Sequence, residues 1–522
     1  MGNSEQPARR RPERTVLYQT VQAWLETFLL RHTPDPDDPA EPRTMPRFVT
    51  EELRAFLACG IAAHGFCRVY CTACGKDELV AFSCKRRGFC PSCCGRRMAD
   101  TAAFLVDEVL PAVPVRQWVL SLPHTLRVLC AYNPEALRAV RALFVRAVSL
   151  CLLRKAPRGL PRARPGAIVF VQRCDSALRL DVHFHALFAD GVFACGLGER
   201  RATFHPLAEL IDDDIARVVR KIQNGVQRFL RKRGLLREPD EPVDSTADTD
   251  LLQLHGASAE GRAAFGNHRG QLDCRPGRGS ASVPRPNGEK SLCRDLDGFS
   301  LHAATCVAAD RTDRLEHLIR YVARPPIAND RLAVLPDGRI AYSLKKRWRD
   351  GSTHVVLDPL TFLERLCALV PRPHKKLVTY HGVFAPAAGY RDRVVPERSG
   401  AAPCRHLPSA AEEGQQPPPQ IDVDSPPPHR RPRAPHVPRR KPPLRRRYYP
   451  WAELLRRVFG TDALVCPDCR GPRRLLAFLT DPPVVRKILA HLGMATQPPA
   501  LARARPPPTQ RATRFHGEVG DE

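Results

Sequence analysis

The sequence lacks long hydrophobic segments, and it is short of acidic residues relative to basic ones. No stretch approaches the ~18 apolar residues that a membrane-spanning helix needs, and the Arg-rich residues 1–15 contain no apolar signal-peptide core. We therefore expect no membrane span and no secretion, but a cytoplasmic, nucleoid-associated protein. The 82 Lys and Arg against 55 Asp and Glu leave a net charge of +27. This excess favours a nucleic-acid partner and argues against an enzyme of acidic substrates.

The sequence also shows no internal repeat, which argues against a protein built from stacked structural units. From about residue 112 to 395, strand-like runs alternate with helical ones, and this pattern predicts an α+β fold. Within it, the polar stretches 237–262 and 275–290 are expected to be surface insertions. The predicted divisions are an N-terminal helix and linker (1–50), a cysteine-rich domain (51–110), a large α+β domain (111–396), a disordered basic Pro-rich linker (397–447), a small C-terminal C-x2-C module (448–495) and a disordered tail (496–522).

Eight of the 19 cysteines lie between Cys59 and Cys94, and such clustering without a secretory signal indicates metal binding. Two C-x2-C pairs separated by fifteen residues match the spacing of structural zinc sites: Cys71 with Cys74, and Cys90 with Cys93. We predict that these four thiolates bind one structural zinc ion in a zinc-ribbon-like module, because four protein ligands leave no open position for catalysis. The alternative is a region of reactive thiols or disulfides. Cys84 is a fifth thiol that could replace a neighbour.

The other cysteines carry weaker signals. Cys466 and Cys469 form a lone C-x2-C pair that no second pair follows, so a degenerate or weak metal site is expected there. Cys67 and Cys94 are expected to be bystanders.

Two basic segments are candidates for phosphate contact. The loop between the N-terminal C-x2-C pairs carries Lys85, Arg86 and Arg87, and residues 426–447 hold nine Lys or Arg with eight prolines and no carboxylate. Both segments could bind phosphates, and both could equally be solvated surface, since charge repulsion and proline favour extended chain.

A pair of histidines lies on a predicted strand, LRLDVHFHALF, at residues 178–188. Because side chains on a strand alternate, His183 and His185 project from one face about 7 Å apart. Two imidazoles on one face can hold a divalent metal and leave positions open for a substrate phosphate. Asp181 lies on the same face as a candidate third ligand, and the sequence cannot choose between it and Gln172, Asp175 or Asp190. Chance pairing on a solvated sheet face is the alternative.

A tyrosine stands at the border of a predicted amphipathic helix, DRLEHLIRYVAR, at residues 313–324, which the following Pro325-Pro326 terminates. Tyr321 is flanked by Arg320 and Arg324. Nearby cations can favour a phenolate and bind a phosphate, so Tyr321 is a candidate nucleophile toward a phosphodiester. The alternative is a half-buried core tyrosine.

Several segments together resemble the rolling-circle transposases of the HUH class, in particular those of the IS91 type and the related common-region elements. They are GAIVFVQRCDSALRLDVHFHALFADGVF, HLIRYVARPPIAND, KKRWRDGSTHVVLDPLTFLERLCALVPRP and YHGVFAP, with FSCKRRGFCPSC and WAELLRRVFGTDALVCPDC resembling the family's zinc-binding and C-terminal parts. The resemblance covers about residues 50–395 and 449–492. It implies an HUH endonuclease domain with a central antiparallel sheet over residues 111–396.

The resemblance further implies that His183-Phe184-His185 binds Mg2+ or Mn2+ and that Tyr321 is the nucleophile. His317 stands four residues before Tyr321, where one branch of the family has a second tyrosine, so the pattern is that of the single-tyrosine branch. The implied reaction is cleavage and transfer of single-stranded DNA at transposon ends through a 5′-phosphotyrosine. Transposon ends, target DNA and the host replication machinery are the expected partners, with Lys85, Arg86, Arg87, Arg320 and Arg324 as DNA contacts. A plasmid replication initiator and a non-catalytic zinc-ribbon regulator are the alternatives.

Overall fold

The computed structural model describes residues 10–32, 45–196, 199–235, 249–265, 268–274, 291–348, 350–396, 449–459 and 462–505. The predicted linker 397–447 and the predicted insertion 275–290 lie outside these residues. No helix in the described part of the chain is long and apolar enough to cross a membrane.

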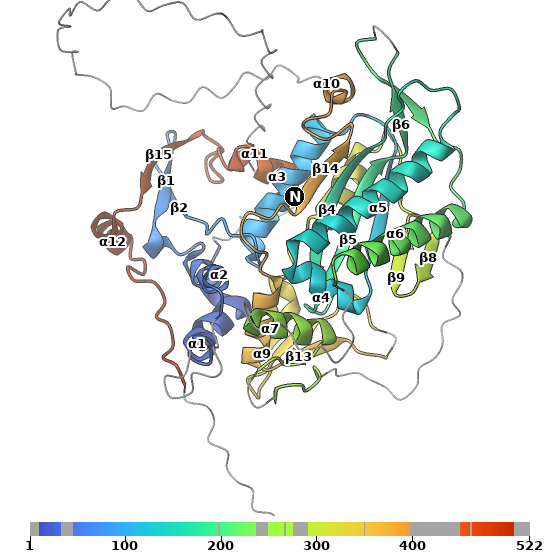
Figure 1. Ribbon diagram of the computed structural model, residues 1–522. Coiled ribbons are helices and arrows are strands. Elements are labelled where there is room, and N and C mark those ends of the chain that lie inside the picture. The colour runs from blue at the N-terminus through green and yellow to red at the C-terminus, as the bar shows by residue number, and fades with distance from the viewer. Residues whose placement is uncertain are drawn as a thin grey trace, which may run out of the picture.

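A seven-stranded sheet occupies the centre of the chain (Figure 1). Its strands follow the order β14-β4-β5-β3-β9-β8, with β10 also pairing with β3, and every pair is antiparallel. Most residues of strands β4 and β5 are buried, as expected for a sheet covered on both faces. The strands are β3 (Val115–Ser121), β4 (Gly166–Cys174), β5 (Leu180–Ala189), β8 (Cys293–Leu296), β9 (Phe299–His302), β10 (Cys306–Val307) and β14 (Val378–Gly382).

Different helices cover the two faces of this sheet. The helices α4 (His124–Tyr132), α5 (Pro134–Lys155) and α6 (Asp212–Lys232) pack on the face to which Val182 and Phe184 contribute; Figure 1 shows α5 and α6 lying across the sheet. On the opposite face, α3 (Pro91–Glu108) and α8 (Thr312–Val322) cover Ile168 and Leu187. Because β5 alternates, His183 and His185 lie on the face covered by α3 and α8.

A second hydrophobic core joins segments from both halves of the chain. It contains buried residues of α1 (Val16–Leu30), α2 (Arg47–Ala58), α7 (Thr249–Glu260), α9 (Pro359–Leu369) and a small sheet of β11 (Leu332–Val334), β12 (Ile340–Ser343) and β13 (His354–Leu357). The predicted surface insertion 237–262 is therefore wrong for α7, where Leu251 and Leu254 are buried. These leucines are one helical turn apart, but the polar residues around them hide the periodicity.

The C-terminal segment packs against the N-terminal one (Figure 1). Strand β15 (Arg473–Leu479) pairs with β1 (Phe66–Cys71), which also pairs with β2 (Asp77–Ala81). Helix α12 (Pro482–His491) shares a small core with Ala62 and Phe66, and α11 (Trp451–Phe459) lies against α3. The remaining elements are the hairpin β6 (Gly191–Ala194) and β7 (Thr203–Pro206), helix α10 (Arg391–Val394), and the short 3-10 turns Pro12–Arg14, Ala62–His64 and Asn329–Arg331.

Residues 500–505 contact helix α1, so the predicted disordered tail is wrong for this part. The backbone N–H of Ala502 donates to the carbonyl of Gln22, and that of Arg505 donates to Thr27 Oγ1 at 3.0 Å. The Arg505 guanidinium lies 4.3 Å from the centre of the Trp24 ring. Residues 506–522 lie outside the described residues.

The mixed helix-and-sheet architecture that the sequence predicts is confirmed.

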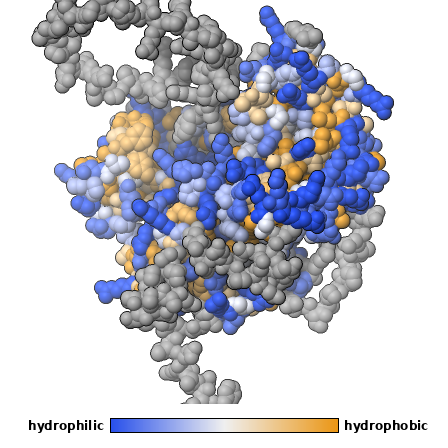
Figure 2. Space-filling view, viewed as in Figure 1, coloured by the Kyte–Doolittle hydropathy of each residue, from blue (hydrophilic) through white to orange (hydrophobic). Residues whose placement is uncertain are grey.

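Several large hydrophobic side chains of the C-terminal segment are exposed. Leu475, Leu476 and Phe478 of β15 are exposed, and Figure 2 shows hydrophobic surface over the β1–β15 region. Hydrophilic surface covers α5 and α6 (Figure 2).

Candidate active site and metal centres

The two histidines of β5 lie close together and differ in exposure. Their ring centres are 5.1 Å apart, and His185 is buried. Burial, with smaller contributions from the charges of His183 and Arg324, lowers the pKa of His185 to about 3. The side chain of Gln117, on β3, places Nε2 2.8 Å from His185 Nδ1. His185 is therefore neutral at physiological pH, which is the form that binds a metal.

The tautomer of His183 follows from its hydrogen bond. Its Nδ1 lies 2.8 Å from the backbone oxygen of Asp181. Because a carbonyl only accepts, Nδ1 is the donor, so in the neutral ring Nε2 is the nitrogen that carries the lone pair. As placed, Gln117 Nε2 donates to His185 Nδ1; with the amide turned over, its oxygen would accept from Nδ1–H and leave the Nε2 lone pair of His185 free. The two imidazoles can thus offer two nitrogen ligands to one divalent cation.

Asp181, one of the candidate third ligands, does not bring its carboxylate close to both histidine rings. Its carboxylate lies 3.3 Å from the Arg127 guanidinium and 3.9 Å from His183 Nδ1. Among the His, Cys, Asp and Glu residues that the structure describes, only two cysteine groups bring three or more ligand atoms within 4.8 Å of one another. Asp181 orients His183 through its backbone and is held by α4 through its side chain.

Of the other three candidates, only Gln172 lies beside the histidines. It is paired with His183 across β4 and β5, and its amide donates to the carbonyl of Val322. Asp175 pairs with Arg179 at 2.7 Å, and both carboxylate oxygens of Asp190 accept from Arg116. Gln172 thereby connects the histidine strand to the last residue of α8.

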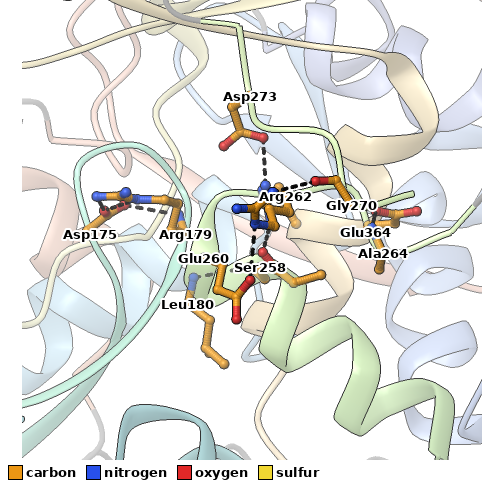
Figure 3. A network of polar contacts seen from close by, with 12 residues as sticks. Asp175, Arg179, Leu180, Ser258, Glu260, Arg262, Ala264, Gly270, Asp273 and Glu364 are labelled. Atoms are coloured by element: carbon orange, nitrogen blue, oxygen red, sulfur yellow. Dashed lines mark hydrogen bonds and ion pairs between the residues drawn. The ribbon is translucent and has the colours of Figure 1, made fainter. Parts of the chain in front are cut away.

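Helix α7 anchors the start of the histidine strand (Figure 3). Ser258 Oγ accepts from the backbone N–H of Leu180 at 3.1 Å, next to the ion pair of Glu260 with Arg262. A cavity of about 450 Å³ lies beside this network and is lined by residues of both charges. Asp181 is among the residues that line this cavity, but His183 and His185 are not.

Tyr321 lies on the exposed face of the amphipathic helix α8. Leu318, Ile319 and Val322 face the core, while Tyr321 is 47% exposed and therefore accessible from solvent. The Arg324 guanidinium lies 4.4 Å from the ring centre and the Lys345 ammonium 5.8 Å from it. Lys345 was not among the residues predicted from the sequence, although the basic run KKR at residues 345–347 could have indicated it.

Arg324 has a buried donor without a partner. Its Nη1 makes no hydrogen bond within the described part of the protein. The same side chain contacts the Tyr321 ring and contributes to the lowered pKa of His185. A buried cationic donor beside an exposed phenol and two neighbouring imidazoles is suited to an anionic group such as a phosphate.

Most of the other residues predicted to contact DNA interact with groups of the protein itself. Arg87 donates to the carbonyl of Lys375, and burial lowers the pKa of Arg87. Arg320 pairs with Glu316, and Arg86 lies 3.7 Å from Glu51. Lys85 is exposed.

The predicted zinc ligand set is wrong, because the two C-x2-C pairs belong to different groups. Cys90 and Cys93 lie with Cys59 and Cys84, and Cys71 and Cys74 lie with Cys466 and Cys469. The β1–β2 hairpin separates the groups. Cys71 and Cys74 lie at its tip, while Cys59 and Cys84 flank its base, and a strand of this length spans roughly 17 Å.

The group of Cys59, Cys84, Cys90 and Cys93 has the geometry of a four-thiolate site. Its Sγ atoms are 3.7 Å apart between Cys59 and Cys93, 3.4 Å between Cys84 and Cys93, and 3.5 Å between Cys59 and Cys90. Thiolates about 2.3 Å from a tetrahedral zinc lie about 3.8 Å apart. Cys84 is thus a member of the group, and Cys59 was missed because no C-x2-C partner marks it.

Two protein-family models match the chain. One is described as "Putative transposase" (Y2_Tnp) and matches residues 166–391, which include the histidine pair and α8. The other, the IS91 transposase zinc-binding domain, matches residues 31–122 and includes the group around Cys90. No curated protein and no solved structure matches the chain. The zinc-binding match and the cysteine groups support structural zinc. Together the matches to a transposase model and to the zinc-binding domain of IS91 transposases support an IS91-type transposase.

Proposed function

We propose that the protein cuts and rejoins single-stranded DNA at transposon ends by HUH-class rolling-circle chemistry. Membership of a transposase family already implies that it binds DNA. The observation that carries the proposal is the exposed Tyr321, on a helix that Gln172 ties to the histidine strand, beside the unpartnered donor of Arg324.

In the proposed site, each part has a separate role. His183 and His185, with the amide oxygen of Gln172 as a further candidate, would hold Mg2+ or Mn2+. The cation would polarise the scissile phosphate and offset the charge that develops on it. Arg324 and Lys345 bind and orient the phosphate next to the Tyr321 hydroxyl.

The covalent step exchanges one phosphate ester for another. The Tyr321 oxygen attacks phosphorus, the bond to the 3′ oxygen breaks, and the phenol proton ends on that oxygen as a free 3′-OH. The downstream strand is left as a 5′-phosphotyrosine, and attack by another 3′-OH reverses the step without ATP. The released 3′-OH is the primer that a host replication machinery would extend. Because His317 occupies the preceding turn, one strand is held covalently at a time.

Two alternatives remain distinct from this proposal. A plasmid replication initiator would use the same chemistry at an origin, and the transposase matches favour transposon ends instead. A non-catalytic zinc-ribbon regulator would need the cysteines and positive charge, but not a tyrosine flanked by Arg324 and Lys345.

A single experiment tests the reaction. The full-length protein is incubated with Mn2+ and single-stranded oligonucleotides of the transposon end, labelled at the 3′ end because the downstream fragment is the one retained. We expect a labelled covalent protein–DNA adduct on a denaturing gel. A regulator would give no adduct, and an initiator would give one with an origin sequence only.

We predict that Arg324→Gln lowers the cleavage rate without lowering stability. Removing one donor to a developing anion costs about 10²–10³ in rate, whereas removing a cation whose Nη1 is buried and unpartnered relieves a desolvation cost. Single-turnover cleavage and the midpoint of thermal unfolding are measured together. Lys346→Gln, an exposed neighbour of Lys345, is the matched control and should cleave normally. Wild-type cleavage by Arg324→Gln would contradict the assigned role.

Helix α11, in the C-terminal segment, also contacts α8, the helix that carries Tyr321. The Arg457 guanidinium lies 2.8 Å from Glu316 on α8 and 2.6 Å from Asp107 on α3. Asp107 also accepts from the Tyr449 hydroxyl. Arg457 thus connects three helices around the candidate nucleophile.

We predict that Arg457→Leu slows cleavage by about 10- to 100-fold, since small displacements of a reacting group are costly. The carboxylates left without this partner should also cost about 1–2 kcal/mol of stability. As Arg457 is a positioning residue, kcat should fall while KM for the oligonucleotide stays unchanged. Arg456→Leu, the exposed neighbouring position, is the control. A rise in KM with unchanged kcat would instead make Arg457 a DNA contact.

A further inference from the structure

We propose that Cys71, Cys74, Cys466 and Cys469 form a second zinc site, which fastens the C-terminal segment to the N-terminal zinc-binding domain. Half of this site lies outside both family-model matches, which end at residues 122 and 391. The inference does not depend on the proposed nuclease reaction.

The four sulfurs have the separation of a tetrahedral thiolate site. All ligand atoms lie within 4.8 Å of one another. Cys71 and Cys469 are 3.4 Å apart and Cys74 and Cys466 are 3.8 Å apart, against about 3.8 Å expected around zinc. These separations are too long for a disulfide bond, whose sulfurs are about 2.05 Å apart.

The two C-x2-C turns have matching backbone conformations. The N–H of Gly75 donates to the carbonyl of Cys71, and the N–H of Arg470 donates to that of Cys466, at 3.0 Å in both cases. Gly75 and Arg470 each follow the second cysteine and have positive φ, 74° and 61°. Each turn therefore directs two thiols to the same side, as in the knuckles of structural zinc sites.

Contacts outside the sulfurs hold the two turns face to face. Lys76 pairs with Asp468 at 2.8 Å, and the backbone N–H of Thr72 donates to the carbonyl of Pro472. A Cβ at Gly471 would lie 2.4 Å from Ala73 Cβ and 3.2 Å from the Cys469 sulfur, so only glycine permits this approach. Strand pairing of β15 with β1 continues directly from the site, from Arg473 opposite Cys71.

A site of four thiolates contributed by two distant segments closes a long loop. Zinc binding displaces four thiol protons and links residues 71–74 to residues 466–469, so its free energy stabilises the folded arrangement of both. The fastened segment is the one that carries Tyr449 and Arg457 to α3 and α8. The second zinc therefore has a structural role that extends beyond the domain in which half of its ligands lie.

The decisive measurement is the zinc content of the purified, reduced full-length protein by elemental mass spectrometry. We expect two zinc ions per chain in the wild type, one in Cys469→Ser, and two in the control Cys67→Ser, a cysteine of the same β1 strand outside both groups. One zinc in the wild type, two in Cys469→Ser, iron in place of zinc, or a Cys71–Cys469 disulfide in the native protein would each overturn the proposal.

A second variant covers the case in which Cys469→Ser does not fold. Gly471→Ala keeps all four thiols but forces the two turns apart. One of its two zinc ions should then pass to a competing chromogenic chelator at least tenfold faster than in the wild type. Transfer of both ions at the wild-type rate would refute the site.

The fastening itself is tested with a specific protease site inserted between residues 409 and 410 of the full chain. After cleavage of the folded protein, the C-terminal fragment should stay bound through gel filtration in the wild type. In Cys469→Ser it should dissociate at least tenfold faster, although β15 and Arg457 are unchanged. Equal dissociation rates would refute the fastening role.

Discussion

Tyr321→Phe is expected to abolish the covalent protein–DNA adduct, with a loss of cleavage on the order of 10⁴-fold or more. The change removes only a hydroxyl from a ring that is 47% exposed, so folding should change by no more than about 0.5 kcal/mol. Binding of the uncut oligonucleotide should also persist, because the Arg324 and Lys345 cations remain beside the ring. Adduct formation, fluorescence anisotropy and thermal unfolding measure the three properties separately.

Two further variants sharpen this test. Tyr380→Phe, on edge strand β14, removes a phenol hydroxyl outside the tyrosine helix and should leave cleavage intact. His183→Ala should reduce cleavage by more than about 100-fold through weaker metal binding, and excess Mn2+ should restore part of that loss. Excess Mn2+ cannot restore Tyr321→Phe. If Tyr321→Phe still forms a 5′ adduct, the nucleophile is another residue, with Tyr380 and Tyr390 the first to replace.

Cys90→Ser is expected to remove the zinc of the N-terminal group and to unfold the domain around it. Cys90 is buried at the N-terminal end of α3, and all its sulfur neighbours are other members of the group. Structural zinc contributes apparent binding free energies of about 10–16 kcal/mol in small zinc domains, as much as a typical domain's whole stability of about 5–15 kcal/mol. Zinc content, circular dichroism and limited proteolysis measure the loss.

The matched control for Cys90→Ser is Cys94→Ser. Cys94 is also buried, lies one turn further along α3 and is outside both cysteine groups, with its thiol directed at the carbonyl of Gly88. It should retain all bound zinc. Because α3 packs against α8, cleavage should fail in Cys90→Ser and persist in Cys94→Ser. Full zinc content in Cys90→Ser would show that this group is not a metal site.

Local chemistry was sufficient to predict several parts of the site. The alternation of residues 178–188 puts His183 and His185 on one strand face, because the side-chain period of a strand is two wherever the strand lies. Likewise, the apolar spacing before Pro325-Pro326 predicts a helix that ends near Val322, with Tyr321 at its border. The C-x2-C spacing predicts turns that present two thiols together, since each turn is formed within a few residues.

The sequence did not predict the contacts between residues of separate elements. The Asp181 carboxylate turns to Arg127 on α4, and Arg87 donates to the carbonyl of Lys375, because partners that the fold brings close compete for the same charged groups. Helix α7 is buried because α9 and α4 cover its leucines, which its own polar flanks do not predict.

The sequence by itself determined which residues are presented together by one strand, one helix or one turn, since these depend on backbone geometry over a few residues. Only the tertiary structure decided how the cysteine turns combine. The β1–β2 hairpin holds Cys71 and Cys74 at its tip, away from Cys90 and Cys93, and the pairing of β15 with β1 brings Cys466 and Cys469 to that tip from almost 400 residues away. A C-x2-C turn is local, but the partner that completes its metal site is set by strand length and strand pairing, which no spacing rule contains.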